Sequence, residues 1–329
     1  MHTAYSIDSK EWQIPVGLQM IPSLILSVGI LFCPFSPRWL VSCDRVDEAQ
    51  QILMNIRSSC YDDIKDELDR IKDEVAYLRE NEIESYRQLF RPPLRRLFLS
   101  GICIQVFQQL TGINGTISYS PQVFRRIFVN ATQLLNDTNL FLPLTLSAGY
   151  ASVFFVTALA TIFFINHFKR RTLLVIGGVT MCIALISIGF LMIFGGKPIH
   201  VMPNNSWVYA YDINDPYLRV LLIVCMHIYV VGFAFSWGPI PWAYCAEIFP
   251  ITIRAKATSL TTAANWLTSA VVTYVVPLLL VYLPFGIYLI FSFLCGLMTI
   301  IAYVFYSDKT SADLETRKTI EDSRRELVY

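Results

Sequence analysis

Long apolar stretches separated by short polar connections make up most of this chain. Seven of them are about 20 residues or longer, enough to cross a bilayer as α-helices. They lie at 14–33, 97–124, 140–165, 172–195, 218–245, 257–281 and 285–306. The pattern predicts an all-α integral membrane protein with about seven transmembrane helices.

The long polar segment between the first two stretches, residues 44–90, carries short apolar repeats at helical spacing. Repeats of this kind predict amphipathic helices, which we expect to lie on the cytoplasmic face of the membrane protein. Pro92 and Pro93 close the segment before the next span.

Composition agrees with a membrane protein. Apolar residues make up 54% of the chain and charged residues 16%, whereas a soluble domain carries about 25% charge. The net charge of +1 and the lack of a basic block argue against nucleic acid as a partner. The eight cysteines have no metal-ligand spacing, and there is no nucleophile elbow or phosphate loop. We therefore expect no enzyme activity, no cofactor and no metal.

Charge also predicts orientation. Arg and Lys cluster before the second span, between the third and fourth, and between the fifth and sixth, which marks these connections as cytoplasmic. Glycosylation sequons begin at Asn130, Asn136 and Asn204 in the other connections, and such sequons belong outside. The prediction is a multi-pass protein of the plasma membrane with a cytoplasmic C-terminus. Seven spans then put the N-terminus outside without a signal peptide, so we expect further helices upstream.

Three amides lie within the second predicted span, at Gln108, Gln109 and Asn114. An unpaired polar group in hydrocarbon costs several kcal/mol, so these side chains must face protein or a water-filled cavity. Neutral amides donate and accept hydrogen bonds without a counter-charge, which suits a polyhydroxylated ligand. The alternative is hydrogen bonding between helices of the bundle.

A second unusual run is Gly238-Pro239-Ile240-Pro241. Each proline removes a backbone donor, which frees carbonyls and predicts a break in the helix. Trp242 follows, and its indole offers a ligand an apolar face and one N–H donor. An ordinary packing kink is the alternative.

Several motifs together resemble one family, the sugar porters of the major facilitator superfamily, with the fungal monosaccharide and disaccharide permeases most similar. The resemblance covers residues 12–315. The motifs are Trp12-Gln-Ile-Pro-Val-Gly-Leu-Gln at the sixth family helix, Pro34-Phe-Ser-Pro-Arg-Trp-Leu40, Asp47-Glu-Ala, Gln108 to Asn114 with Tyr119, Trp237 to Trp242, Glu247-Ile-Phe-Pro250, Arg254-Ala-Lys256, Asn265-Trp266 and the tail Ser307 to Glu315.

The resemblance implies helices 6–12 of a twelve-helix transporter, without helices one to five. It divides the chain into a polar remnant (1–13), family helix 6 (14–33), a cytoplasmic loop (34–96), a six-helix bundle (97–306) and a cytoplasmic tail (307–329). The family binds sugar between two bundles and alternates access by rocking one against the other. The partners implied are a small sugar, the lipid bilayer and the missing N-terminal bundle, so the chain is expected to be truncated and incomplete for transport.

The resemblance also assigns roles to residues. Sugar contacts are expected from Gln108, Gln109, Asn114, Tyr119, Trp242 and Asn265. Hinge or gating roles are expected for Gly238, Pro239, Pro241 and Trp266. Cytoplasmic salt bridges are expected from Arg38, Arg170, Arg171, Glu247, Arg254 and Glu315, with simple interfacial snorkelling as the alternative.

Four positions depart from the family pattern. Phe35 and Asn166 replace cytoplasmic carboxylates, Lys169 replaces a glycine, and Phe154 stands where an asparagine that contacts sugar is expected. These departures leave a non-transporting sugar sensor or a degenerate half-transporter as the alternative to a transporter. A seven-span receptor fits the span count but not the motifs.

Proton coupling stays open at this stage. The residue usually linked to it lies on the absent first helix, so the sequence is compatible with proton symport and with uniport. His227, inside the fifth span, is interpreted as a hydrogen-bonded packing residue in preference to a proton relay.

Overall fold

A computed structural model describes residues 10–57, 61–81, 85–92, 94–128, 141–165, 167–201, 208–213 and 215–305. The predicted sequons at Asn130, Asn136 and Asn204, and also Asn166 and Glu315, lie outside these ranges. The chain divides into two compact units, Met1–Glu82 and Ile83–Tyr329.

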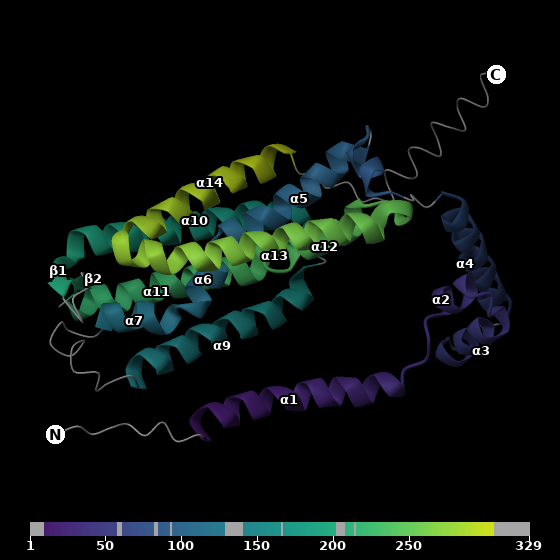
Figure 1. Cartoon of the computed structure of the whole chain (residues 1–329), viewed down its shortest axis with the longest axis horizontal. Coiled ribbons are helices and arrows are strands. Elements are labelled where there is room, and N and C mark those ends of the chain that lie inside the picture. Colours follow the sequence, from purple (N-terminus) through teal and green to yellow (C-terminus); the bar gives the residue numbers. More distant parts are fainter. Residues whose placement is uncertain are drawn as a thin grey trace. The chain divides into compact units, whose positions relative to one another are not determined.

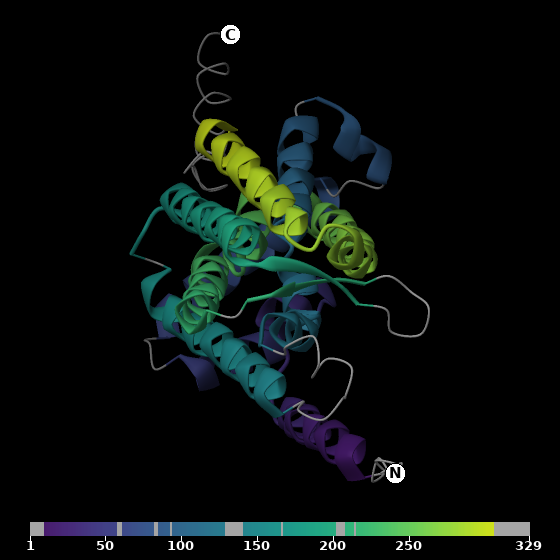
Figure 2. The same ribbon diagram turned by 90° about the vertical axis from the view of Figure 1, so that its left-hand side faces the viewer.

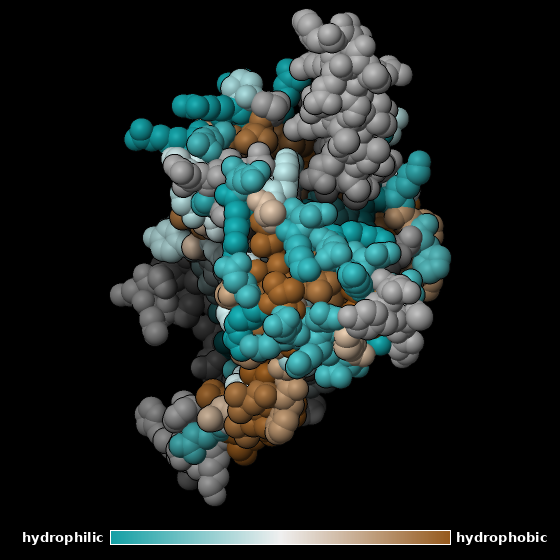
Figure 3. Space-filling view, turned by 90° about the vertical axis from the view of Figure 1, so that its right-hand side faces the viewer, coloured by the Kyte–Doolittle hydropathy of each residue, from teal (hydrophilic) through white to brown (hydrophobic). Residues whose placement is uncertain are grey.

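The first unit begins with the apolar helix α1 (Lys10–Leu31), whose described side chains are all exposed. A small separate core follows, built by α2 (Pro37–Ser42), α3 (Val46–Ile56) and α4 (Tyr61–Asn81). In α4 the buried residues are Ile64, Leu68, Ile71 and Val75, three or four apart, so one apolar stripe faces this core. The predicted amphipathic helices are therefore confirmed. The outer surface of α3 and α4 is largely hydrophilic, with apolar side chains visible between the hydrophilic ones (Figure 3).

The second unit is a bundle of long helices lying alongside one another (Figure 1). Its elements are the 3₁₀ turn η1 (Tyr86–Phe90), α5 (Leu94–Leu110), α6 (Ile113–Ser118), α7 (Ser120–Phe128), α9 (Phe141–Phe164), α10 (Arg170–Gly195), α11 (Pro216–Gly232), the π-helical turn η2 (Phe233–Trp237), α12 (Ile240–Ile248), α13 (Ile251–Tyr282) and α14 (Gly286–Phe305).

Five described helices are long and apolar enough to cross a membrane, with α11, η2 and α12 counted as one span. They are Leu142–Phe164, Arg170–Gly195, Pro216–Ile248, Thr252–Tyr282 and Gly286–Val304. The first predicted span corresponds to a shorter apolar helix, Val16–Leu31.

The second predicted span, 97–124, is not one continuous helix, and that prediction was wrong in detail. Gly112 has a φ of 82°, a left-handed conformation that lies between the end of α5 and the start of α6. The ring of Phe291 packs where a Cβ of residue 112 would stand. The break therefore needs glycine for its backbone angle and for space.

The connection between α10 and α11 holds a small hairpin that the helical periodicity did not predict. Strands β1 (Lys197–Val201) and β2 (Val208–Asp212) pair antiparallel, with Lys197 opposite Asp212 and Val201 opposite Val208. The hairpin lies at one end of the bundle (Figure 2).

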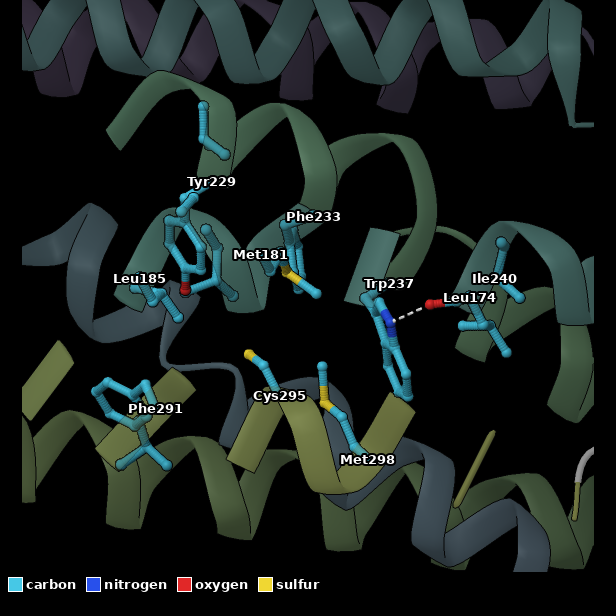
Figure 4. Close-up of a cluster of buried hydrophobic side chains, with 14 of the residues drawn as sticks. Leu174, Met181, Leu185, Tyr229, Phe233, Trp237, Ile240, Phe291, Cys295 and Met298 are labelled. Carbon is cyan, nitrogen blue, oxygen red and sulfur yellow. Dashed lines mark hydrogen bonds between the residues drawn. The ribbon is translucent and has the colours of Figure 1, made fainter. Parts of the chain in front are cut away.

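The core of the bundle lies where α10, η2 and α14 meet (Figure 4). Trp237 is fully buried, and its indole Nε1 donates a 2.9 Å hydrogen bond to the carbonyl oxygen of Leu174. Gly177 on α10 lies against Ser236 and the Gly232 carbonyl, so the two backbones approach closely. This contact fixes the interrupted helix against α10.

Candidate functional site

A cluster of buried amides joins α5 to α13. Asn265 on α13 is 1% exposed, and its Nδ2 donates to Oε1 of Gln105 (2.8 Å) and Oε1 of Gln108 (2.7 Å). Its Oδ1 accepts a 2.9 Å hydrogen bond from Nε2 of Gln109. Since α5 presents three amides to one asparagine, Asn265 holds all three in fixed orientations.

The interrupted helix supplies acceptors to the same cluster. Nε2 of Gln108 donates to the carbonyl oxygens of Trp237 (2.9 Å) and Gly238 (2.8 Å). The π-turn η2 and the prolines at 239 and 241 remove the usual helical donors for carbonyls in this region. The predicted break at Gly238–Pro241 is confirmed, and a side chain satisfies the carbonyls that it frees.

Asn114 extends the cluster onto α6. Its Nδ2 donates to Oε1 of Gln109 (2.6 Å) and to Oγ of Ser269 on α13 (2.8 Å). This contact spans the break at Gly112, because Gln109 lies at the end of α5 and Asn114 lies at the start of α6. The amides therefore bond helix to helix, as the alternative interpretation predicts, and their contact with a polyhydroxylated ligand stays a prediction.

The amides also face a cavity of ≈ 320 Å³. This volume lies at the lower end of the range of about 300–1,000 Å³ for small-molecule sites. The cavity is lined by Gln108, Gln109, Asn114, Phe154, Ala158, Phe233, Ala234, Gly238, Pro239, Trp242, Asn265 and Trp266. No formal charge lines it, so it suits a neutral ligand.

Two amide groups keep capacity for such a ligand. Gln109 uses one of its two N–H donors, and Oδ1 of Asn114 has no hydrogen-bond partner among the described residues. The indoles of Trp242 and Trp266 are 41% and 64% exposed and offer apolar faces beside them. A donor, an acceptor and two aromatic faces are what a sugar ring can use.

Most of the predicted contact residues meet at this cavity, and Tyr119 does not. Its hydroxyl makes a long 3.4 Å hydrogen bond to the carbonyl of Thr273, away from the lining. Of the predicted hinge residues, Gly238, Pro239 and Trp266 line the cavity, whereas Pro241 is buried and does not line it.

Sequence reasoning missed Gln105 and Phe233, among others. Gln105 is fully buried and bonds Asn265, and its Nε2 approaches the Pro241 carbonyl at 3.5 Å. Its position three and four residues before Gln108 and Gln109 places it on the same helix face, which was an available signal. Phe233 also lines the cavity, but an aromatic residue in an apolar stretch gives no such signal.

Of the six residues expected to form cytoplasmic salt bridges, the structure describes five, and each makes a local contact, while Glu315 lies outside the described residues. Arg170 forms a 2.9 Å ion pair with Glu247, which joins α10 to α12. Arg254 bonds the carbonyl of Phe249, and Arg171 bonds that of Tyr303 and stacks on its ring. Arg38 pairs with Glu74 inside the first unit.

The departures from the family pattern also have places in the structure. Phe35 stacks on Trp39 with ring centroids 5.1 Å apart, and Lys169 is exposed just before α10. Phe154 lines the cavity and stacks on Phe233.

His227 is engaged in packing. Its Nδ1 lies 2.8 Å from the carbonyl oxygen of Ile223, and its ring meets that of Tyr150 edge-on. Among the described residues, no group of three His, Cys, Asp or Glu side chains could hold a metal ion.

Comparison with solved structures shows a shared fold. The chain is similar to the proton:xylose symporter XylE bound to 6-bromo-6-deoxy-D-glucose, with a TM-score of 0.66 and 24% identity over 91% of this chain and 57% of the other. A double-tryptophan mutant of XylE gives a TM-score of 0.69 at 23% identity over the same shares.

Curated relatives give the same picture at the sequence level. Sugar transport protein 1 of Arabidopsis thaliana is 31% identical over 92% of this chain and 54% of its own length. The MFS glucose transporter mfs1 of Aspergillus flavus is 30% identical over 87% of this chain and 53% of its own. The chain thus spans about half the length of these relatives, which come from a plant and a fungus.

The decisive match is to a family model, and it covers almost the whole chain. The model described as "Sugar (and other) transporter" matches residues 1–319. With the helical fold and the residues above, this match shows that the chain belongs to the sugar transporter family of the major facilitator superfamily.

Proposed function

We propose that this chain binds a neutral monosaccharide in the cavity between α5, α6, η2 and α13, and that the protein moves this sugar across the membrane by alternating access. The proposal rests on the amide cluster and the cavity beside it. The cavity is lined by no formal charge, by two amides that keep a free hydrogen-bonding group, and by two exposed indoles.

The hydrogen bonds within the cluster would hold the amide side chains in the orientation that binds sugar. Gln108 and Asn265 spend their donors within the protein, so they cannot swing away from the cavity easily. Gln109 and Asn114 would then meet sugar hydroxyls with little loss of side-chain freedom. Such preorganisation strengthens binding by lowering its entropic cost.

Movement would arise where helices are interrupted next to the cavity. Gly238 and Pro239 line the cavity directly after the π-turn, and α12 continues from there to Glu247. The ion pair between Glu247 and Arg170 fastens the far end of α12 to α10. Hinge motion of α12, with this ion pair as its latch, is the gating step we propose.

Sugar binding to the purified chain in lipid nanodiscs tests the first part. The Gln109→Leu variant keeps the size of the side chain and removes both hydrogen-bonding groups, so we expect the Kd for sugar to rise about 10-fold. Gln51→Leu is the matched control, because Gln51 is exposed on α3. Absence of saturable binding to the unaltered chain would overturn the proposal.

Uptake by cells without their own hexose transporters tests the second part. Saturable uptake would support transport, and sugar-driven proton entry in the same cells would support symport of the kind named for XylE. Uptake without proton entry would indicate uniport.

A sugar sensor is the second candidate, and Phe154 favours it. The residue puts an aromatic ring into the lining where the family resemblance leads us to expect an amide. Binding without uptake, at normal surface expression of a protein that also contains the expected upstream helices, would support the sensor and contradict transport.

Membrane placement is part of the same proposal. We place the protein in the plasma membrane, with its C-terminus and the Arg170–Glu247 pair on the cytoplasmic side. An epitope tag after Tyr329 should be reached by antibody only after permeabilisation, and labelling of intact cells would contradict this orientation.

A further inference from the structure

The lining of the cavity contains two chemically different sectors. The amide sector consists of Gln108, Gln109, Asn114 and Asn265, and the aromatic sector consists of Phe154 and Phe233. Helix α9 supplies Phe154 and the π-turn η2 supplies Phe233. Their rings stack with centroids 6.3 Å apart and an interplanar angle of 25°.

The aromatic sector is held in place on both sides. Phe233 is 5% exposed and belongs to the bundle core beside Trp237 (Figure 4). The hydroxyl of Thr161 on α9 donates a 3.4 Å hydrogen bond to the carbonyl of Ala234, which ties α9 to η2. Small residues, Ala158 and Ala234, complete this part of the lining. The rings therefore have little freedom to withdraw when a ligand binds.

The two sectors make opposite demands on a ligand. A hydroxyl placed against the stacked rings gives up its bonds to water and finds no strong partner. An apolar group in the same place gains dispersion contacts and is removed from water. The cavity therefore suits a molecule with hydroxyls along one edge and an apolar group on another.

Among simple sugars, 6-deoxyhexoses have this distribution. Carbon 6 is the one carbon of a hexopyranose outside the ring, so removing its hydroxyl leaves a protruding methyl group. The ring hydroxyls remain for the amide sector. A methyl group can reach an aromatic face in a way that a ring methylene cannot.

We propose that this cavity selects 6-deoxyhexoses over the corresponding hexoses, and that Phe154 determines this specificity. The inference rests on the proposed function, because it names the substrate class of the same cavity. We assign the specificity to Phe154 because its ring lines the cavity and stacks on Phe233, which is packed in the bundle core.

Matched sugar pairs test the selection on the unaltered chain. We would measure Kd in nanodiscs for 6-deoxy-D-glucose against D-glucose, and for D-fucose against D-galactose, since each pair differs only in the oxygen on carbon 6. The 6-deoxy member should bind about 10-fold tighter in at least one pair, in line with discrimination by an apolar pocket. Equal or tighter binding of both hexoses would overturn the inference and leave the proposed function standing.

Variants locate the effect. Phe154→Asn should remove the preference, bringing the Kd ratio of each pair to about 1 or reversing it, while Phe154→Leu keeps an apolar wall and should retain most of it. Phe155→Asn is the matched control, because Phe155 is 61% exposed and does not line the cavity. A preference unchanged in Phe154→Asn would overturn the role of Phe154. If no sugar of the panel binds the unaltered chain, the proposed function itself fails.

Discussion

The side chain of Asn265 forms hydrogen bonds with three other side chains, more than any other side chain of the site does. Its amide bonds Gln105, Gln108 and Gln109, all on α5. Buried amides of this kind are costly when a partner is lost, at about 1–3 kcal/mol for each group left unsatisfied. The network therefore stabilises the bundle and the site together.

We expect Asn265→Ala to lower the free energy of unfolding by about 2 kcal/mol or more, because Gln105, Gln108 and Gln109 lose a partner at once. Thermal unfolding in detergent measures this effect, and sugar Kd should rise in the same protein. Asn55→Ala, at an exposed position on α3, should change neither. An unchanged unfolding temperature in Asn265→Ala would argue against the network as drawn.

Gly112 is a second residue at which one substitution decides a local structure. An alanine there would hold a left-handed φ of 82° and place its Cβ 2.7 Å from the ring of Phe291. We predict a loss of stability of at least about 1–2 kcal/mol, read from denaturant unfolding. Gly149→Ala is the control, because nothing lies within 4 Å of its Cβ position. Equal effects of the two substitutions would contradict the assigned break.

At this scale the sequence predicted polar residues better than apolar ones. Gln108, Gln109 and Asn114 stand out because amides are rare in membrane spans. Phe154 was noticed only because the family pattern has another residue at that position. Phe233 could not be predicted, because a phenylalanine in an apolar stretch can face lipid, the core or a cavity. Partners such as Glu74 for Arg38 depend on three-dimensional packing that spacing does not encode.

At the scale of elements, the site depends on two interrupted helices that lie beside α13 and α10. The interruption near Gly238 was predictable, since two prolines cannot be accommodated without freeing carbonyls. The break at Gly112 was not, because an isolated glycine in a membrane helix often serves packing alone. The β1–β2 hairpin also escaped prediction, as its short strands carry no helical or long apolar pattern.

Close approach of α10 to the π-turn gives a prediction at this scale. In Gly177→Ala the new Cβ would collide with Ser236 and lie 2.9 Å from the Gly232 carbonyl, so α10 must move away from η2. We expect this variant to unfold at a clearly lower temperature. Gly296→Ala should be neutral or stabilising, since its Cβ would meet only Sγ of Cys182 at 3.6 Å and alanine favours helix. The reverse order of stabilities would contradict this packing.

For the whole molecule, the ion pair between Arg170 and Glu247 offers a way to separate binding from movement. Glu247→Gln removes the charge at the end of α12, at a residue that does not line the cavity. We expect sugar Kd to stay within about 2-fold, while the maximal rate of uptake changes. Glu48→Gln, in the exposed pair with Arg45 on α3, should change neither quantity. A shift in Kd larger than the shift in uptake rate would speak against a latch.

The central claim is that a neutral monosaccharide binds in the amide-lined cavity. A structure of the chain determined with bound sugar tests this most directly. The account predicts the ring between Trp242 and the amides, with hydroxyls within hydrogen-bonding distance of Nε2 of Gln109 and Oδ1 of Asn114. Sugar found elsewhere on the chain, or a cavity still empty at saturating sugar, would contradict it.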